Sequence, residues 1–386
     1  MKATKLFKDF FDSEKAGGVV LIACTVLSML LANSGYRQTY LDFWHLNFGG
    51  HGLSHWINDG LMAIFFLLIG LELEREIYIG ELSNIKNALL PVSAAIGGML
   101  VPALIYLFFN VNTSTQPGIG IPMATDIAFA LGVLSLLGNR IPTSLKVFLT
   151  ALAVIDDLGA ITVIAIFYTK SLVLINLAIA LGIWLVLFVL NRLKVYNLIP
   201  YIIGGVVMWY FMLQSGVHAT ISGVILAFAL PFKDGADTSP SYLLQHWLHK
   251  PVAFIILPLF ALANTAIVIN DGWQQNLAKP LGLGILAGLV VGKPLGVMLV
   301  SFIAVKSGIC RLPGDVNWKQ VLGVGFLAGI GFTMSIFITL LAFDAAEMIN
   351  DAKFFILLAS LISGILGFLW LKNTFRKTNP SLTTEK

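Results

Sequence analysis

Long apolar runs alternate with short polar segments along the whole chain. Each run is about as long as a helix that crosses a hydrocarbon layer of roughly 30 Å, at about 1.5 Å rise per residue. The pattern predicts about twelve membrane-spanning helices, and the shortest are those at 198–212 and 217–231. The approximate bounds of all twelve are 16–34, 54–76, 88–109, 119–138, 144–168, 172–190, 198–212, 217–231, 244–268, 282–304, 320–342 and 353–372.

Hydrophobic residues make up 58% of the 386 positions and charged residues only 11%. Soluble domains carry about 25% charged residues, so the composition excludes a soluble protein. We expect an all-α polytopic membrane protein with a single integral membrane domain over residues 1–386 and a membrane region from about 12 to 372. The two cysteines are too far apart in the sequence to indicate a disulfide or metal framework. A formal charge of +4 without an arginine-rich tract does not indicate nucleic-acid binding.

The basic residues are distributed unevenly between the two sides of the predicted membrane. Nineteen of the 24 lysines and arginines fall on one side, and Lys293 lies inside a span. Because cytoplasmic loops carry the excess of positive charge, both chain termini are predicted to be cytoplasmic. A cleaved signal peptide is the alternative for the first apolar run, but the acidic residues before it and its length favour a span. The basic residues on the opposite side are Arg37, Lys170, Lys279 and Lys353.

Two predicted spans contain glycine and proline near their centres, in residues 118–126 and 323–333. Proline removes a backbone donor and glycine lowers helix stability, so both spans are expected to unwind at mid-membrane. As the fourth and eleventh spans, they occupy matching positions in a transporter built of inverted repeats. The alternative for 323–333 is close helix packing through small residues. Packing is preferred in the 282–304 span, where glycines recur every four residues as a ridge: Gly284, Gly288, Gly292 and Gly296.

Asp156 and Asp157 lie side by side in the apolar stretch 145–168. A carboxylate at the bilayer centre costs on the order of 2.5–3.5 kcal/mol, so the pair predicts an ion or proton site rather than a structural feature. On a helix the two side chains point about 100° apart. One can therefore bind a cation while the other faces a neighbouring helix. Their titration is expected to be coupled, so neither aspartate is assigned its own behaviour.

Three further polar residues lie inside predicted spans. Thr125 and Asp126 follow the first predicted break, where Asp126 either caps the second half-helix or both caps it and binds an ion. Lys293 is about eleven residues from either end of its span, a depth of roughly 16 Å that exceeds comfortable snorkelling. We expect it to pair with a buried carboxylate. Carboxylate, hydroxyl and carbonyl oxygens suit a small alkali cation, and burial lets a proton compete for the same carboxylate.

A second cluster lies at the cytoplasmic end of the 54–76 span. The spacing of Glu72, Arg75 and Glu76 puts them on one helical face, where Glu72 can pair with Arg75. A solvated helix end and a regulatory role explain this cluster equally well. His218 opens a later span, and a hydrogen-bonded polar histidine is preferred over a pH sensor there.

Four short segments together resemble the NhaA-type sodium/proton antiporter family. They read ATDIAFA at 124–130, VIDDLGA at 154–160, GKPLG at 292–296 and GIGFTMS at 329–335. The resemblance covers about residues 10–372 and implies twelve spans, with the fourth and eleventh unwound and crossing, and alternating access. Inverted repeats are an established feature of NhaA, so the matching breaks and the resemblance are not independent indications.

The resemblance also implies electrogenic Na⁺(Li⁺)/H⁺ exchange across a bacterial inner membrane, with more protons entering than sodium ions leaving. It implies neither enzyme catalysis nor a cofactor, and it names Na⁺, Li⁺, H⁺ and membrane lipid as partners. Asp157 would be the principal Na⁺/Li⁺ and proton carboxylate. Asp156 would assist while paired with Lys293, and Thr125 and Asp126 would shape the site.

By the same resemblance, Glu72, Arg75 and Glu76 would belong to a cytoplasmic pH-responsive region, to which we add His218. Family members carry a glutamate and nearby basic residues before the ninth span, whereas this chain has Gln245 within Tyr-Leu-Leu-Gln-His at 242–246. We therefore expect shifted or weakened pH activation. The aromatic segment 36–48 resembles the periplasmic hairpin that joins two protomers, which implies a homodimer.

Three other functions compete with antiport. A cation-coupled importer of organic solutes would need recognition groups, and the predicted cavity offers mostly carboxylates and one lysine. An intramembrane aspartyl protease would need aspartates that converge from different helices, whereas Asp156 and Asp157 diverge on one helix. Asp126 could supply the partner, but the Tyr-Asp and Gly-x-Gly-Asp signatures of that class are absent from the sequence. A lysine near the site and the lack of a ring-forming repeat argue against a channel.

Overall fold

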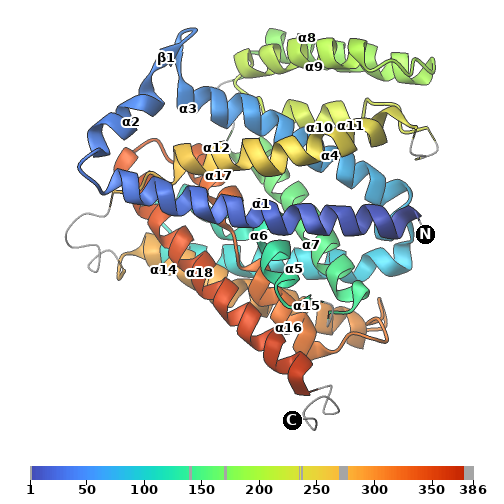
Figure 1. The fold of residues 1–386 in the computed structure, drawn as a ribbon, viewed down its shortest axis with the longest axis vertical. Helices are drawn as coiled ribbons and strands as arrows, with labels where there is room; N and C mark the ends of the chain where they lie inside the picture. The colour runs from blue at the N-terminus through green and yellow to red at the C-terminus, as the bar shows by residue number, and fades with distance from the viewer. Residues whose placement is uncertain are drawn as a thin grey trace. The chain divides into compact units, whose positions relative to one another are not determined.

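The structure, a computed structural model, describes residues 2–138, 141–168, 172–233, 235, 238–268 and 277–377 (Figure 1). Within these ranges the side chains of residues 2–15, 81, 166 and 377 are not described. Of the basic residues behind the predicted orientation, Arg140, Lys170 and Lys386 lie outside the described ranges. The chain divides into two compact units, which are described separately. A single membrane domain over 1–386 stays a prediction.

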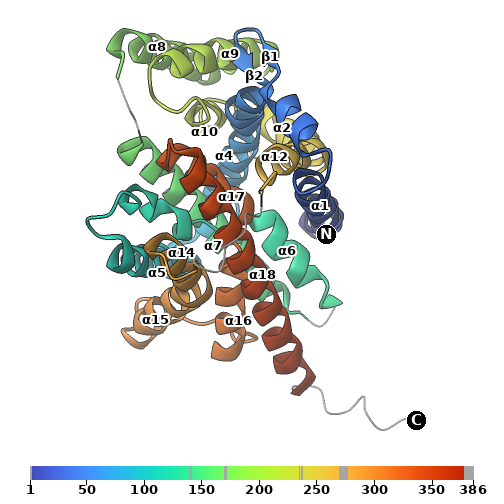
Figure 2. The same cartoon turned by 90° about the vertical axis from the view of Figure 1, so that its left-hand side faces the viewer.

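Unit 1 comprises Met1–Val19, Asn84–Ala160 and Ile269–Lys386. Its helices α14, α15 and η6 pack against α5, and α18 packs along α16, as both ribbon views show (Figures 1 and 2). The element bounds are α5 (Ile85–Asn110), η3 (Gln116–Met123), α6 (Ile127–Ser135), α7 (Thr143–Phe167), α14 (Pro280–Ala287), η6 (Gly288–Gly292), α15 (Lys293–Lys306), α16 (Trp318–Ala328), α17 (Phe332–Ala342) and α18 (Ala346–Lys377). Helices α1 (Lys2–Ala32) and α7 each continue from one unit into the other.

Unit 2 comprises Val20–Ser83 and Ile161–Val268. Its main helix pairs are α4 with α10 and α8 with α9. The element bounds are α2 (Arg37–His45), β1 (Asn47–Phe48), β2 (His51–Gly52), α3 (Leu53–His55), η1 (Trp56–Leu61), α4 (Met62–Tyr78), η2 (Glu81–Ser83), α8 (Leu174–Arg192), α9 (Ile199–Gln214), α10 (Ile221–Ala227), α11 (Pro240–Pro251), η5 (Val252–Ile256) and α12 (Leu257–Asn264).

The strands β1 and β2 form an antiparallel hairpin that begins at the end of the aromatic segment 36–48, which resembled a dimer contact, and continues beyond it. Phe48 lies opposite His51, and the two residues between them, Gly49 and Gly50, have φ angles of 61° and 90°. Two successive positive φ angles make the primed two-residue turn that matches strand twist, and glycine adopts them without strain. The pair of glycines therefore fixes the hairpin locally.

Eight helical stretches among the described residues are long and apolar enough to cross a membrane, and two bent helix pairs raise the number to ten. The fold is therefore mostly helical and polytopic. The two shortest predicted spans account for the difference between ten and twelve. The 198–212 segment forms α9, which is shorter than a full span, and 217–231 contains only the seven-residue α10. The first helix begins at Lys2 rather than at residue 16, because the polar N-terminal residues continue the helix.

One-turn π segments interrupt two long helices just before a proline. η5 is followed by Leu257 and Pro258, and η6 is followed by Lys293 and Pro294. In an α-helix a proline ring collides with the carbonyl four residues earlier. The wider π turn moves that carbonyl aside. In each π turn the residue before the proline donates the closing hydrogen bond. These bonds run from Leu257 N to Val252 O and from Lys293 N to Gly288 O.

The predicted packing ridge of the 282–304 span is confirmed. A Cβ atom added at any of its four glycines would meet atoms of α5. At Gly296 the clashing atom is the backbone carbonyl oxygen of Gly97. We call these four residues the glycine ridge: Gly284, Gly288, Gly292 and Gly296.

Gly296→Ala is expected to lower the free energy of unfolding by about 1–3 kcal/mol, because the added methyl meets backbone that cannot move aside. Heating the detergent-solubilised protein while following unfolding measures the change. Gly182→Ala on α8 is the control, since an added Cβ there meets nothing within 4 Å. An equal loss of stability in both variants would contradict close packing at the ridge.

Candidate functional site

Two non-helical stretches of unit 1 contact each other directly. The first is 124–126, between η3 and α6, and the second is 329–331, between α16 and α17. Asp126 N donates to Ile330 O at 2.6 Å, and Thr125 Oγ1 lies 2.9 Å from Ala328 O. Ser335 Oγ of α17 donates to Ile121 O at 2.7 Å. Backbone groups that a continuous helix would satisfy internally are thus satisfied across the two stretches.

Asp126 caps two helices with one carboxylate. Its Oδ1 accepts from Phe129 N at 2.9 Å in the first turn of α6. Its Oδ2 accepts from Thr333 N at 3.0 Å and from Thr333 Oγ1 in the first turn of α17. The first N–H groups of a helix have no internal partner and carry partial positive charge, so a carboxylate there is stabilising. Both oxygens of Asp126 are therefore engaged by helix termini.

Asp156 is fully buried, and its two oxygens differ in their surroundings. Oδ2 lies 2.6 Å from Lys293 Nζ and 2.7 Å from Thr125 Oγ1. Lys293 is also fully buried, and its Nζ donates to Met123 O as well. No described residue donates a hydrogen bond to Asp156 Oδ1. A buried acceptor without a donor is uncommon, so this oxygen is available to a cation or a proton.

Asp157 is the next residue on α7 and is fully buried as well. It attracts Lys293 electrostatically, although its side chain points about 100° away from that of Asp156. Among the described residues of unit 1, the buried charged side chains are three aspartates and one lysine: Asp126, Asp156, Asp157 and Lys293. With all four ionised, these side chains would carry three negative charges and one positive charge. Such an arrangement is costly unless a cation or protons complete it.

No three His, Cys, Asp or Glu side chains in the described part of the chain are placed to hold a metal ion together. A cation at Asp156 and Asp157 would therefore complete its shell with other oxygens, such as a hydroxyl, carbonyls or water. The hydroxyl of Thr125 is the nearest such group, because it already contacts Asp156. Small hard cations prefer oxygen ligands of these kinds.

The residues predicted for a pH-responsive region lie in unit 2. Glu72 on α4 is 4.0 Å from His249 Nδ1 on α11, and both side chains are mostly buried. Arg75 lies over the ring of Tyr242, also on α11, at 5.3 Å from its centre. Glu76 shares the end of α4 with them. Glu72 and Arg75 thus face α11, the helix that contains Gln245.

His218 is set apart from that cluster along the chain, just before α10. Its Nε2 lies 3.0 Å from the carbonyl oxygen of Tyr168. This contact is the hydrogen-bonded role that the sequence favoured for His218.

Several groups at the site were not predicted from the sequence. Thr333, Ser335 and the carbonyls of Met123 and Ala328 all contact predicted site residues or the stretches that hold them. Thr333 had a recognisable signal, because it follows the glycines at 329 and 331 as a polar residue opening a helix. The carbonyls had none, since every residue has one.

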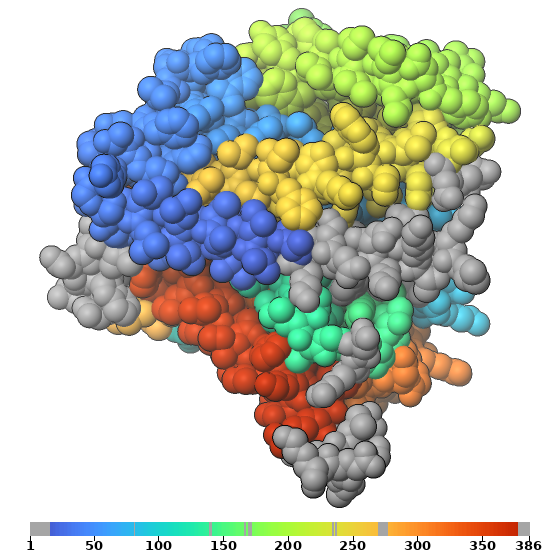
Figure 3. All heavy atoms as spheres, viewed as in Figure 1, coloured from blue at the N-terminus to red at the C-terminus, as the bar shows by residue number. Residues whose placement is uncertain are grey.

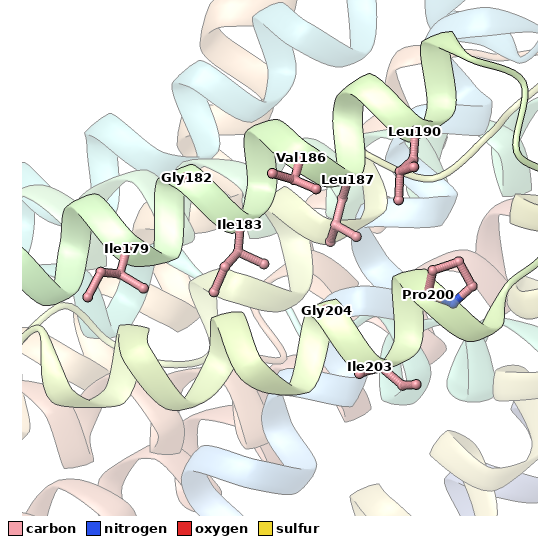
Figure 4. A pocket seen from close by; sticks show the side chains of 9 residues that line it. All are labelled: Ile179, Gly182, Ile183, Val186, Leu187, Leu190, Pro200, Ile203 and Gly204. Carbon is pink, nitrogen blue, oxygen red and sulfur yellow. The ribbon is translucent and has the colours of Figure 1, made fainter.

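The groove between α8 and α9 has a volume of about 620 Å³ and only apolar or glycine lining (Figure 4). Only 11% of the most apolar part of α8 is buried inside the protein, and Figure 3 shows both helices, in yellow-green, at the surface. Without a polar group the groove offers nothing to an ion. Its lining residues are Ile179, Gly182, Ile183, Val186, Leu187, Leu190, Pro200, Ile203 and Gly204.

A family model described as Na⁺/H⁺ antiporter 1 matches residues 8–371 of the chain. The chain belongs to this family. The Na⁺/H⁺ antiporter NhaA of Flavobacterium psychrophilum is 65% identical over 378 residues, which cover 98% of each protein. The Na⁺/H⁺ antiporter NhaA of Cytophaga hutchinsonii is 61% identical over 386 residues, covering all of both. The predicted resemblance to NhaA-type antiporters is confirmed.

A solved structure shares the fold of this antiporter-family chain. The sodium proton antiporter MjNhaP1 from Methanocaldococcus jannaschii, at pH 8, aligns with a TM-score of 0.58 and 17% sequence identity. The alignment covers 98% of this chain and 99% of that one. Together with the apolar helices, it supports a multi-pass membrane protein.

Thr333→Val is expected to lower the free energy of unfolding by about 1.5–3 kcal/mol, because it removes a buried donor to an ionised carboxylate. Thermal unfolding in detergent measures the loss. The matched control is Thr339→Val on the same helix, which removes only a bond to Ser335 O within α17. If the control loses as much stability as Thr333→Val, then capping by Asp126 is not what the Thr333 hydroxyl supports.

Proposed function

We propose that the protein is an electrogenic Na⁺(Li⁺)/H⁺ antiporter that exports sodium in exchange for protons by alternating access. Membership of the Na⁺/H⁺ antiporter 1 family supports the identity of the exchanged ions. The observation that matters most is the buried charge of unit 1, which comprises three aspartates and one lysine. A group of this kind must be neutralised, and both Na⁺ and H⁺ can do it.

The exchange follows from competition for one set of carboxylates. When Asp157 and Asp156 hold a proton, their negative charge is neutralised, so a cation gains little binding free energy there. When a cation binds their oxygens, it replaces the proton and stabilises the ionised forms. Binding of the two ions is therefore mutually exclusive, and each can cross only in its own half of the cycle.

The site residues divide the work. Asp157 is the principal carboxylate for Na⁺, Li⁺ and protons. Asp156 assists through its open Oδ1, and Lys293 holds its Oδ2 until a cation binds. Thr125 has a single hydroxyl hydrogen but two acceptors within reach, so it can leave Asp156 Oδ2 for Ala328 O when a cation arrives. Asp126 shapes the site through the two helix caps. Lys293 releases a proton when a cation takes its place, which makes protons outnumber sodium ions.

The proposed transporter would have twelve membrane spans. Besides the eight long helices, they are the apolar part of α1, the bent pair α16–α17, α9 and the short α10. The fourth and eleventh spans would be unwound, would cross at the site and would occupy equivalent positions in two inverted repeats. Non-helical backbone at mid-membrane is tolerated only where protein or a water-filled cavity satisfies it, as the bonds between 124–126 and 329–331 do.

The chain would lie in a bacterial inner membrane with both termini in the cytoplasm, as the distribution of basic residues indicates. Membrane lipid would cover the exposed faces of α8 and α9. A homodimer would form through the β1–β2 hairpin region, where Tyr36 and Phe48 are each 74% exposed. The transported ions are substrates, and we propose neither a cofactor nor catalytic chemistry.

Regulation by pH would act through Glu72, Arg75 and Glu76 at the end of α4, where the first two face α11, with His218 contributing elsewhere in unit 2. Gln245 on α11 replaces the glutamate that other family members carry. Loss of that charge would shift or weaken activation.

Everted membrane vesicles with an imposed proton gradient test the function. Adding Na⁺ or Li⁺ between pH 6.5 and 8.5 should collapse the gradient, whereas K⁺ should not. Asp157→Asn should reduce the response to background, because the neutral amide can neither bind the proton nor balance a cation. A response to Na⁺ that survives in Asp157→Asn would disprove the site. No response in the wild type, beside an active control antiporter, would disprove the function.

Lys293→Ala tests the second proton carrier. We expect the variant to keep Na⁺/H⁺ exchange but to lose most net charge movement, measured with a potential-sensitive dye in proteoliposomes. Net charge movement that equals the wild type would remove Lys293 as the proton carrier and leave antiport in place.

A further inference from the structure

The π turn η6 lies immediately before Lys293 and Pro294 and is the last turn before the site lysine. We infer that Pro294 is a positioning residue, which through this π turn aims the Lys293 ammonium at Asp156. The inference deepens the proposed function, on which its transport measurements rest.

The π turn accommodates Pro294. In an α-helix its ring would meet the carbonyl of Val290, which lies inside η6. Pro258 stands in the same relation to η5, with Phe254 four residues before it. The same local pattern occurs twice, once beside the site in unit 1 and once in unit 2. The two features also occur separately: η1 is a π turn without a following proline, and Pro91 and Pro102 lie within α5 without a π turn.

The π turn sets the rotation of the helix after it. In a straight α-helix a step of four residues turns about 40° past a full circle, so three steps along the glycine ridge would drift by about 120°. A π turn contains one residue more than an α turn, and this reduces the accumulated rotation by about 100°. The remaining drift of about 20° explains why all four ridge glycines meet α5.

Lys293 follows the ridge residue Gly292, so the same rotation fixes the direction of its side chain. Its Cδ and Nζ lie 3.7 Å from the point that a Cβ atom on Gly98 of α5 would occupy. Nζ then reaches Met123 O and, at 2.6 Å, Asp156 Oδ2. Without the extra residue, α14 and α15 would be out of phase by about 100°. Either the ridge would leave α5 or the ammonium would leave Asp156.

The Lys293 ammonium depends on its buried counter-charge. Its side chain is 0% exposed, so an ammonium turned away from Asp156 would lose its buried counter-charge and find no water. The charged groups that face it are Asp156 and Asp157 from α7. A change in its direction is therefore expected to alter ion exchange before it alters the fold.

Pro294→Ala restores a backbone donor and removes the ring, so an α-type bond to Val290 O can replace the π turn. We expect the apparent Na⁺ affinity in proteoliposomes to change by about threefold to tenfold, with a shift of the pH profile in the same direction as in Lys293→Ala. Because Pro294 acts through Lys293, the double variant should differ from Lys293→Ala alone by less than about twofold. Pro258→Ala is the matched control and should keep the wild-type profile.

A deletion provides the decisive variant. Removing Val291, which is 48% exposed, from Pro294→Ala would take out the one residue that the π turn absorbs. An α-helix of that length restores the original rotation, so the affinity and pH profile should return toward the wild type. Failure of the deletion to rescue, a wild-type profile in Pro294→Ala, or an equal shift in Pro258→Ala would each overturn the inference.

Failure of the proposed function would be visible separately, as absence of exchange in the wild-type protein. In that case an experimental structure of Pro294→Ala decides the inference. A rotated α15 with Lys293 displaced from Asp156 supports it, and an unchanged pair between Lys293 and Asp156 overturns it.

Discussion

Unit 1 depends on one carboxylate that joins two distant helix starts. Asp126 accepts hydrogen bonds from the first turns of α6 and α17, and its partner Thr333 in α17 is 207 positions further along the chain. Because both helices present partial positive charge to the same side chain, neither can shift without leaving the carboxylate partly unsatisfied. The two non-helical stretches are held together at this point, and Thr125 and Asp156 take their places from it.

The surroundings of the neighbouring aspartates differ, and this difference explains how fixed helix ends can adjoin a site that is proposed to change its charge. Asp126 is saturated by helix caps, whereas Asp156 keeps one oxygen without a described donor. Lys293 forms an ion pair with one of the three buried carboxylates, Asp156. In the proposed function Asp126 fixes the geometry, and the pair on α7 responds to ions.

The sequence predicted the long apolar helices well, because about twenty apolar positions in a row have few explanations. The site residues that it named stay predictions. It overestimated 217–231, where an apolar run forms only the short α10. The ion pair between Lys293 and Asp156 was expected from the depth of the lysine and from the resemblance, and the structure shows it. The partner of Asp126 could not be predicted. Thr333 lies 207 positions away from it, and the periodicity of a helix does not indicate which distant side chain it will meet.

Those long separations have a consequence for how the protein is made. Ribosomes deliver the chain from its N-terminus, so α6 and α7 reach the membrane well before α15 and α17 exist. Until then Asp126 lacks its second helix and Asp156 lacks its ammonium, and both are best served by staying protonated or near water. The final quarter of the polypeptide therefore completes the candidate ion site, and a chain interrupted before α17 would leave acidic groups without their partners inside the bilayer.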